Sequence, residues 1–409
     1  MRFLAELAQR QRFGICPGLD NIRGISAALG NPQNDFKAIH IAGTNGKGAV
    51  SAMIDAALRA EGLKIGRYTS PHLVRLNERF FLNGEPVDDQ TLDDHSRRID
   101  SLLAQFPSLT FFEALTAVAY LLYAAEKVDY AVLECGLGGR LDATNVCRPA
   151  ISIVTKIGLD HCDWLGDTVE KIAAEKSGII KAQVPVVLAK NSSEVRAVVE
   201  RTAKALNAPF YYAPDLADEL EIPEDISLKG SFNRENAVTA IAAIKVLRGG
   251  FSSANKRGLA NVVWPGRFQT VGNFIVDGAH NPPAAKALSA ALPKDEKFNL
   301  IAGFCGDKAI AEVLSILAPH IERGFAVKTN NPRSLTAIET AAKMESAGIP
   351  AIACESLTEA LRLVRGKSAA AHRTLICGSL FLSGEALVAL DAYPWSSSRF
   401  DPSEQLHRR

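Results

Sequence analysis

Along the chain, short continuous apolar runs alternate with segments in which apolar residues recur at a helical period. This pattern predicts alternating strands and helices. Residues 38–42 are a short apolar run typical of a buried strand. The next segment predicts a helix whose apolar face carries Val50, Met53, Ile54, Ala57 and Leu58. Further strands are expected at residues 64–69, 130–133, 150–156 and 184–189. Helices are expected at residues 91–105, 112–126, 168–177, 193–206 and 233–247.

The same alternation restarts in the last third of the chain. Strands are expected at residues 274–276, 299–302, 325–327, 351–353 and 374–377, with helices between them. Residues 249–258 are small, polar and turn-rich, which predicts a linker. The 409 residues also exceed what one core usually serves. We therefore predict two α/β domains with mainly parallel sheets, residues 1–262 and a smaller one at 263–409.

A glycine-rich turn with one lysine, residues 43–48, joins the first predicted strand to its helix. Glycines let backbone N–H groups surround an anion, a helix N-terminus adds partial positive charge, and Lys47 adds a full charge. The spacing from Gly43 to Gly46 is shorter than in the strict phosphate-loop pattern, and Gly48 follows the lysine. The turn alone therefore fits either a phosphate site or an ordinary strand–helix connection.

Polar side chains follow three predicted strands, and they suggest a metal site. Ser70, Glu134 and His161 each lie at or beyond a strand end, where open α/β sheets place ligands. Taken singly, they also fit a turn serine, a surface or capping carboxylate and a structural histidine. Grouped with the phosphate turn, they favour Mg²⁺ between protein carboxylate and phosphate. Lys176 ends a predicted helix, where its charge would also be favourable without any catalytic role.

Composition and charge limit the classes of molecule that the protein is expected to bind. The 46 basic and 45 acidic residues leave a net charge of +1, so no global field points to nucleic acid or to a membrane surface. Seven cysteines are scattered singly, which favours free thiols over a disulfide framework. Residues 1–12 are charged without an apolar signal core, and the longest apolar stretch, 114–125, is too short to span a bilayer. We expect a cytoplasmic protein.

Eight motifs in a fixed order resemble the folylpolyglutamate synthase and dihydrofolate synthase family, within the Mur ligase superfamily. They lie at residues 43–48, 69–73, 111–113, 136–145, 157–161, 175–181, 264–268 and 277–282. The resemblance runs from about residue 29 to residue 381, nearly the whole chain. It implies a P-loop-type ATP-binding domain with a mainly parallel sheet, plus a smaller Rossmann-like C-terminal glutamate ligase domain.

The resemblance also implies an activity. ATP phosphorylates a folate-type carboxylate to an acyl phosphate, and the amine of L-glutamate attacks it to form an amide. The implied small molecules are ATP, Mg²⁺, L-glutamate, and dihydropteroate or folate, and the implied state is a monomer. The sequence does not decide between a dihydropteroate acceptor, a reduced folate, or both.

Residue roles follow from the resemblance by motif. Contacts to ATP are implied for Thr44, Asn45, Gly46, Lys47, Gly48, Ala49, Asn236, Arg267 and Asp277. Mg²⁺ ligands are implied at Ser70, Glu134 and His161. Lys176 matches a lysine that CO₂ carboxylates in the family, and it joins Lys47 and His280 as a candidate catalytic residue. Ser379 is a candidate contact to glutamate or the acyl phosphate.

The chain departs from the family pattern in two places. Ala49 stands where the family usually has serine, and Ser231-Phe232-Asn233 replaces a His-Gln pair. Two other interpretations stay open. A cell-wall Mur ligase is disfavoured because only 42 residues precede Gly43, too few for a nucleotide-sugar domain. A nucleotide-binding regulatory protein draws its support from Ala49 alone.

Overall fold

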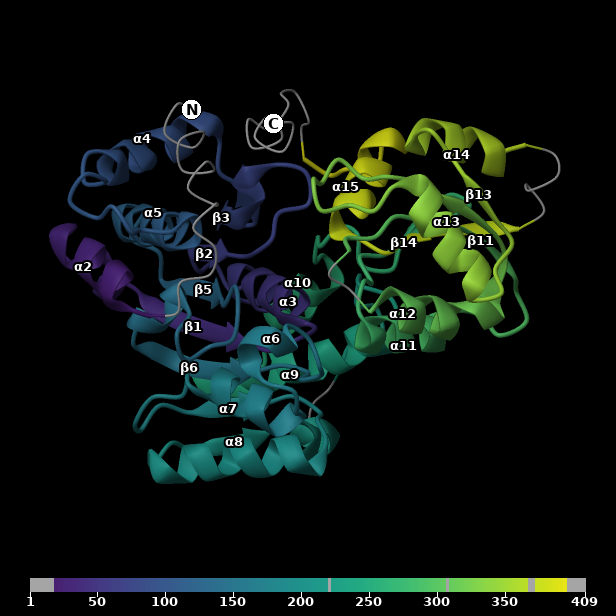
Figure 1. The fold of residues 1–409 in the computed structure, drawn as a ribbon. Coiled ribbons are helices and arrows are strands. Elements are labelled where there is room, and N and C mark those ends of the chain that lie inside the picture. Colours follow the sequence, from purple (N-terminus) through teal and green to yellow (C-terminus); the bar gives the residue numbers. More distant parts are fainter. Residues whose placement is uncertain (1–17, 220–221, 307–308, 367–371, 396–409) are drawn as a thin grey trace. The chain divides into compact units, whose positions relative to one another are not determined.

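The protein consists of two compact units. The structure is a computed structural model that describes residues 18–219, 222–306, 309–366 and 372–395. One unit is Met1–Ser227 with Asn233–Val262, and the other is Leu228–Phe232 with Val263–Arg409 (Figure 1). The charged segment at residues 1–12, in which the sequence shows no apolar signal core, lies outside the described residues.

The first unit is built on an eight-stranded sheet in the order β4-β3-β2-β5-β1-β6-β7-β8. Pairing is parallel except where β3 meets β2 and β4. The strands are β1 (Lys37–Ala42), β2 (Ile65–Tyr68), β3 (Phe80–Leu82), β4 (Glu85–Pro86), β5 (Tyr130–Glu134), β6 (Pro149–Val154), β7 (Val186–Leu188) and β8 (Phe210–Tyr212).

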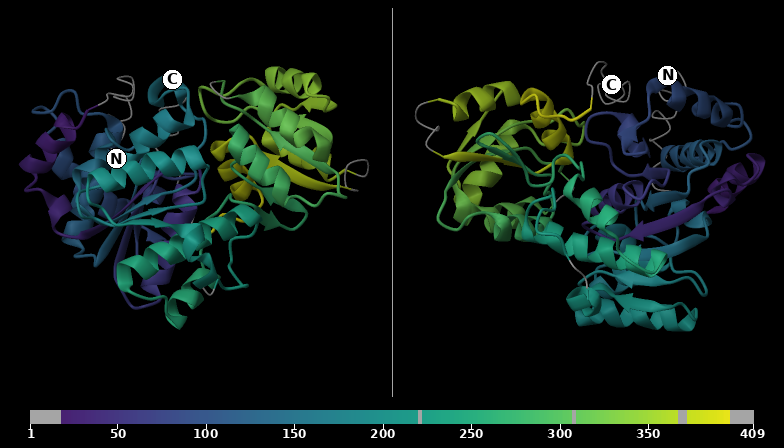
Figure 2. Two further views of the ribbon diagram at one scale, coloured as in Figure 1. Left: turned by 90° about the horizontal axis from the view of Figure 1, so that it is seen from below. Right: turned by 180° about the vertical axis from the view of Figure 1, so that it is seen from behind.

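Helices cover both faces of this sheet (Figure 2). They are α2 (Asp20–Ala28), α3 (Lys47–Arg59), α4 (Asp89–Asp100), α5 (Phe111–Ala125), α6 (Cys162–Leu165), α7 (Val169–Ser177), α8 (Ser193–Ala205), α9 (Ser231–Arg248) and α10 (Ser253–Ala260). The central strand β1 is buried from Ala38 to Ala42, as its continuous apolar run predicts. Thr168 caps α7 by accepting a hydrogen bond from the Lys171 N–H, as expected.

The second unit has a six-stranded sheet in the order β13-β12-β11-β14-β10-β9, parallel except for the β9–β10 pair. Its strands are β9 (Gln269–Val271), β10 (Phe274–Val276), β11 (Phe298–Ala302), β12 (Ile321–Ala326), β13 (Ala351–Ala353) and β14 (Arg373–Cys377). Its helices are α11 (Pro282–Ala291), α12 (Ile310–Leu317), α13 (Ala337–Ser346), α14 (Leu357–Val364) and α15 (Leu380–Ala389). The predicted fold class is confirmed.

The linker predicted at residues 249–258 is wrong. Most of that segment belongs to α10, which packs against α3 inside the first unit. A Cβ at Gly258 would collide with the backbone of Ala56, and Asn255 Nδ2 donates to Ala57 O at 3.0 Å. Small residues here therefore permit close helix packing rather than flexibility. The chain passes between the units at residues 227/228, 232/233 and 262/263.

None of the helices in the described part of the chain has the length and apolar character that a membrane crossing needs.

A buried polar cluster joins the central strand to the loop after β5. His40 on β1 is fully buried, and its Nε2 lies 2.8 Å from Thr144 Oγ1 and 3.2 Å from Cys135 Sγ. The Thr144 hydroxyl in turn donates to the carboxylate of Asp142. Burial, and secondarily the charge of Lys181, lower the pKa of His40 to about 3. His40 is therefore a neutral imidazole at physiological pH.

This cluster predicts a specific loss of stability in acid. The folded-state pKa of His40 is depressed, so between pH 6.5 and pH 3 the unfolded chain binds the additional proton. His40 should thus cost about 2 kcal/mol of the free energy of unfolding as pH falls from 7.5 to 5. Chemical denaturation of wild type and His40→Gln across this range measures it. Equal pH slopes for the two proteins would contradict the assignment.

Candidate active site

The phosphate turn places free backbone donors at the start of α3. The helix begins at Lys47, and its N-cap Gly46 has φ of 89°, which favours glycine. A Cβ at Gly46 would also collide with Asn236 Oδ1, so the predicted ATP contact on α9 does lie against the turn. The first-turn N–H groups of a helix have no intrahelical acceptor. Those after Gly46 therefore form an anion site next to a lysine.

Hydrogen bonds fix this turn to the end of β6. The N–H groups of Thr44 and Asn45 donate to Lys156 O at 2.9 and 3.1 Å. Thr155 Oγ1 donates to Asn45 O at 2.9 Å, and the Thr44 hydroxyl donates to Gly158 O at 3.1 Å. The loop that leads from β6 towards His161 is therefore held against the phosphate turn.

Two lysine ammonium groups share one acceptor beneath the turn. Lys47 Nζ lies 3.0 Å and Lys176 Nζ 2.8 Å from the carbonyl oxygen of Gly43. Lys176 comes from the end of α7, and only 4% of it is exposed. Burial, followed by repulsion from Lys47, lowers the pKa of Lys176 to about 7. A neutral, nucleophilic amine is thus available at Lys176 near neutral pH.

Two of the three predicted metal ligands lie together. Ser70 follows β2, Glu134 ends β5, and these strands are neighbours in the sheet. The Ser70 N–H donates to Glu134 Oε2 at 3.4 Å, and Glu134 is buried. His161 is the N-cap of α6, with 45% of its side chain exposed and Nε2 3.9 Å from Asp160 Oδ1. The structure brings Ser70 and Glu134 together and places His161 on the loop beyond β6.

The side chains at this edge of the sheet suit one mode of Mg²⁺ binding. In the described residues no group of three or more His, Cys, Asp and Glu side chains could hold a metal ion. Mg²⁺ is usually bound by one or two carboxylates together with phosphate oxygens and water, rather than by a protein cage. One buried carboxylate and one hydroxyl beside an anion site fit that mode, so Glu134 and Ser70 suit Mg²⁺ that arrives with a nucleotide.

The loop after β5 contacts the end of α7. A Cβ at Gly139 would lie 2.8 Å from the carbonyl oxygen of Lys176, and the Arg140 N–H donates to Glu175 O at 2.8 Å. Asp142 holds the loop in shape by accepting from the N–H groups of Gly136 and Leu137 at 2.8 and 2.9 Å. Sequence reasoning gave Asp142 no role, although an acidic residue in a glycine-rich loop was a usable signal.

The candidate residues of the second unit gather at the ends of β10 and β14, which are neighbours. Asp277 is buried, which raises its pKa, and it accepts from the N–H groups of Phe268 and Ala279, both at 2.8 Å. The Arg267 guanidinium opposes that rise in pKa and donates to Gly266 O at 3.0 Å. The Asp277 carboxylate thus shapes the turn that carries Arg267.

His280 and Ser379 lie on two connected loops of this unit. His280 Nδ1 is 2.7 Å from Gly278 O, so Nδ1 carries the proton of the neutral ring and donates it there. Ser379 is the N-cap of α15, and its Oγ accepts from the Phe381 N–H at 3.2 Å. The Gly378 N–H donates to Ala279 O at 2.8 Å and thereby joins the two loops.

The two departures from the family pattern have visible consequences. Ala49 is buried in the first turn of α3, and the hydroxyl of Ser51 does not take the place of the absent one, because Ser51 Oγ donates back to Gly48 O at 2.8 Å. Phe232 packs edge-on against Phe268, with ring centroids 6.3 Å apart, inside the second unit.

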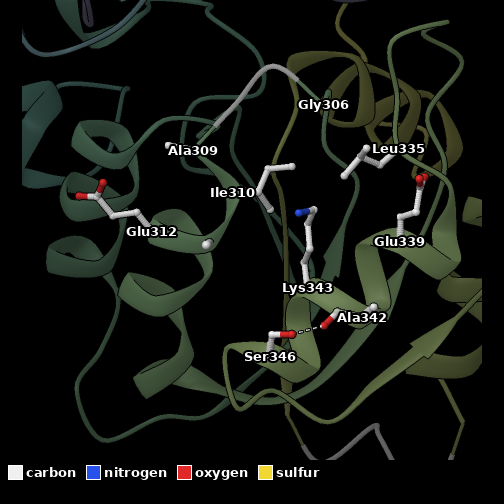
Figure 3. A pocket seen from close by; sticks show the side chains of 10 residues that line it. Gly306, Ala309, Ile310, Glu312, Leu335, Glu339, Ala342, Lys343 and Ser346 are labelled. Carbon is white, nitrogen blue, oxygen red and sulfur yellow. Dashed lines mark hydrogen bonds between the residues drawn. The ribbon is translucent and has the colours of Figure 1, made fainter. Parts of the chain in front are cut away.

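A surface hollow of about 790 Å³ lies between α12 and α13 (Figure 3). Ile310 and Leu335 form part of its wall, and the side chain of Lys343 extends between them. None of the predicted site residues lines this hollow. It is therefore separate from the candidate active site.

Two family descriptions match the chain. "Mur ligase middle domain" matches residues 41–213, and "Mur ligase, glutamate ligase domain" matches residues 266–380. A dihydrofolate synthase/folylpolyglutamate synthase of Bacillus subtilis is 36% identical over 69% of this chain and 74% of its own. The protein of that name from Escherichia coli is 32% identical over 92% of both chains.

Solved structures agree with these relatives. Mycobacterium tuberculosis folylpolyglutamate synthase complexed with ADP has a TM-score of 0.86 and 28% identity, covering 96% of this chain and 99% of its own. Escherichia coli FolC in complex with DHPP and ADP has a TM-score of 0.85 and 29% identity, covering 95% and 98%. The predicted class of enzyme, an ATP-dependent amide-forming ligase, is confirmed, and the regulatory alternative is not favoured. The chain belongs to the folylpolyglutamate synthase/dihydrofolate synthase family of Mur ligases.

Proposed function

We propose that this chain joins L-glutamate to the carboxylate of a pteroate or folate through an acyl phosphate formed with ATP. The main support is the start of α3, where unsatisfied N–H groups and Lys47 meet beside Ser70 and Glu134. Residues 1–262 would act as the ATP-binding domain and residues 263–409 as the glutamate ligase domain. A structure of the related Yersinia pestis enzyme is described as complexed with AMPPNP and Mn ion.

In this proposal the backbone N–H groups from Gly46 to Ala49, together with Lys47, bind the ATP phosphates, and Thr44 and Asn45 are proposed as further contacts to ATP. Lys47 offsets the negative charge that develops as the terminal phosphoryl group moves to the acceptor carboxylate. Ser70, Glu134 and His161 would hold Mg²⁺. The ion would supply charge neutralisation and orientation of the phosphates when bound.

Lys176 is the residue that we propose to be carboxylated. Its neutral amine attacks CO₂, a C–N bond forms, and one proton is released to water, which leaves a carbamate anion. The pKa of about 7 supplies the neutral amine that this step needs. The product replaces an ammonium beside Lys47 with an anion, so the repulsion between the two side chains becomes an attraction.

The second unit would contribute the remaining contacts. Arg267 and Asp277 are proposed to contact ATP, as is Asn236 of the first unit. His280, whose Nδ1 donates to Gly278 O, is proposed as a further catalytic residue. Ser379 is proposed to contact glutamate or the acyl phosphate. We further propose a cytoplasmic monomer that does not bind nucleic acid, consistent with the net charge of +1.

The activity can be tested directly with two acceptors. Phosphate release from ATP should require L-glutamate together with dihydropteroate or tetrahydrofolate, because the acyl phosphate forms on the acceptor and is consumed by the amine. Assays with each acceptor alone, and with glutamate omitted, measure this and decide whether one or both acceptors are used. Phosphate release that is independent of glutamate would contradict the proposal.

The proposed carbamate predicts near-complete inactivation of Lys176→Ala, with partial rescue by short-chain carboxylates. In wild type stripped of CO₂, recovery of activity on adding bicarbonate should be greater at pH 8 than at pH 6, because the neutral amine increases through the pKa of about 7. Lys171→Ala is the matched control, since Lys171 lies on the same helix, is exposed and pairs with Asp167. An intact mass showing unmodified Lys176 in fully active enzyme would refute the carbamate.

Because Ala49 lacks a hydroxyl, we expect its replacement by serine to change kcat/KM for ATP only modestly. A neutral hydrogen bond contributes about 0.5–1.5 kcal/mol, so Ala49→Ser should change kcat/KM for ATP by about tenfold or less. Lys47→Ala removes a charge-assisted contact and should lower kcat/KM by on the order of a hundredfold or more. Steady-state kinetics of the three proteins measure this. A thousandfold gain in Ala49→Ser would instead mark the native chain as a degenerate ligase.

A further inference from the structure

One buried carboxylate organises the loop that begins at Ser70. Glu78 is 5% exposed and lies in a short 3₁₀ helix, Leu76–Arg79, that follows the loop. Its Oε2 accepts from the N–H of Leu73 at 2.7 Å. Its Oε1 accepts from the N–H groups of Val74 and Arg75, at 2.8 and 2.7 Å. Three successive backbone N–H groups thus converge on one side chain, as they do around a bound anion.

Both ends of this loop are fastened to the same 3₁₀ helix. Before the loop, the Thr69 N–H donates to Arg79 O at 3.1 Å, and Thr69 Oγ1 donates to Glu78 O at 3.0 Å. Within the loop, Arg79 Nε donates to His72 Nδ1 at 3.0 Å. Glu78 and its neighbour Arg79 therefore hold the residue before the loop, Thr69, and the second part of the loop, residues 72–75.

The loop has no regular secondary structure, so it depends on such contacts for its conformation, and Arg75 adds an ion pair with Asp89 at 2.7 Å. Residues 70–75 lie outside the strands and helices, and none of them is buried. Ordering such a backbone costs about 1–2 kcal/mol per residue, which three charge-assisted hydrogen bonds can offset. At the start of the loop, the Ser70 N–H is 3.4 Å from Glu134 Oε2, so the conformation of the loop decides where Ser70 lies relative to that carboxylate.

We propose that Glu78 is a positioning residue for the divalent cation: it does not contact the metal, but it holds Ser70 beside Glu134. This inference rests on the proposed function, which makes Ser70 and Glu134 metal ligands. Removal of the carboxylate releases three N–H groups that are partly open to water, so the chain still folds while the loop samples other conformations. Partners that orient metal ligands typically contribute 10–100-fold to metal affinity.

The first test is Glu78→Gln, which keeps the shape but replaces one acceptor oxygen with an NH₂ group. Hydrogen exchange of the amides of Leu73, Val74 and Arg75 should become faster in the nucleotide-free protein. Binding of Mn²⁺ with a non-hydrolysable ATP analogue, followed by electron paramagnetic resonance, should weaken by roughly tenfold or more. The KM for Mg²⁺ should rise by the same factor, while kcat at saturating Mg²⁺ stays within about twofold.

Two further variants complete the comparison. Glu78→Asp keeps the negative charge on a shorter side chain and should recover part of the Mn²⁺ affinity; it also serves if Glu78→Gln does not fold. The matched control is Glu339→Gln in the second unit. Glu339 accepts from the Thr336 N–H at 2.8 Å in the same kind of helix cap, but it is far from these loops in sequence and is exposed. Its replacement should leave Mn²⁺ binding unchanged.

The outcomes separate this inference from the proposed function. If Ser70→Ala and Glu134→Gln leave Mn²⁺ affinity unchanged, the proposed metal ligands are wrong. If those variants weaken Mn²⁺ binding but Glu78→Gln does not, only the positioning role is overturned. A Glu78→Gln protein with a lower melting temperature and lower kcat, but unchanged Mn²⁺ affinity, would show that Glu78 merely stabilises the fold.

Discussion

The carbonyl oxygen of Gly43 accepts hydrogen bonds from both Lys47 and Lys176, and this shared acceptor brings together two lysine side chains of the candidate site. Two ammonium groups around one oxygen repel each other strongly in a buried site. Burial is the main reason that the pKa of Lys176 falls to about 7, and repulsion from Lys47 adds to it. The shared acceptor keeps the two side chains close, so a change of charge at one lysine acts directly on the other.

The strand order of the first sheet explains why distant segments reach this point. β1 lies between β5 and β6, and β2 lies next to β5. Neighbouring strands are about 4.8 Å apart, so the ends of these four strands fall within roughly 15 Å along one edge. Ser70, Glu134, the phosphate turn and the loop towards His161 all follow those ends. Their separation in the sequence, from residue 43 to residue 161, therefore says little about their separation in space.

Sequence reasoning found the strands and helices that have a clear period, and it found the site residues that stand in motifs. It missed β3, β4, β8 and β9, which are only two or three residues long and lie at or next to the edges of their sheets. It predicted a linker at residues 249–258, because glycine and serine are typical of turns. The same residues also permit a capped helix to pack closely, here with Ser252 as the cap and Gly258 against Ala56, and that packing depends on tertiary contact. The hydrogen bonds of Glu78 could not be predicted from the sequence either, since its partners are backbone N–H groups in a particular loop conformation.

A buried carboxylate shapes each of three loops near the candidate site residues. Glu78, Asp142 and Asp277 are each buried, and each accepts hydrogen bonds from at least two backbone N–H groups of a nearby loop. An internal carboxylate in such a position supplies the anion that the backbone would otherwise draw from solvent. The first turn of α3 differs, because Gly46 offers its N–H groups no capping side chain. Internal carboxylates therefore give these loops their shape, whereas the N–H groups at the start of α3 are the ones for which we propose a phosphate as the acceptor.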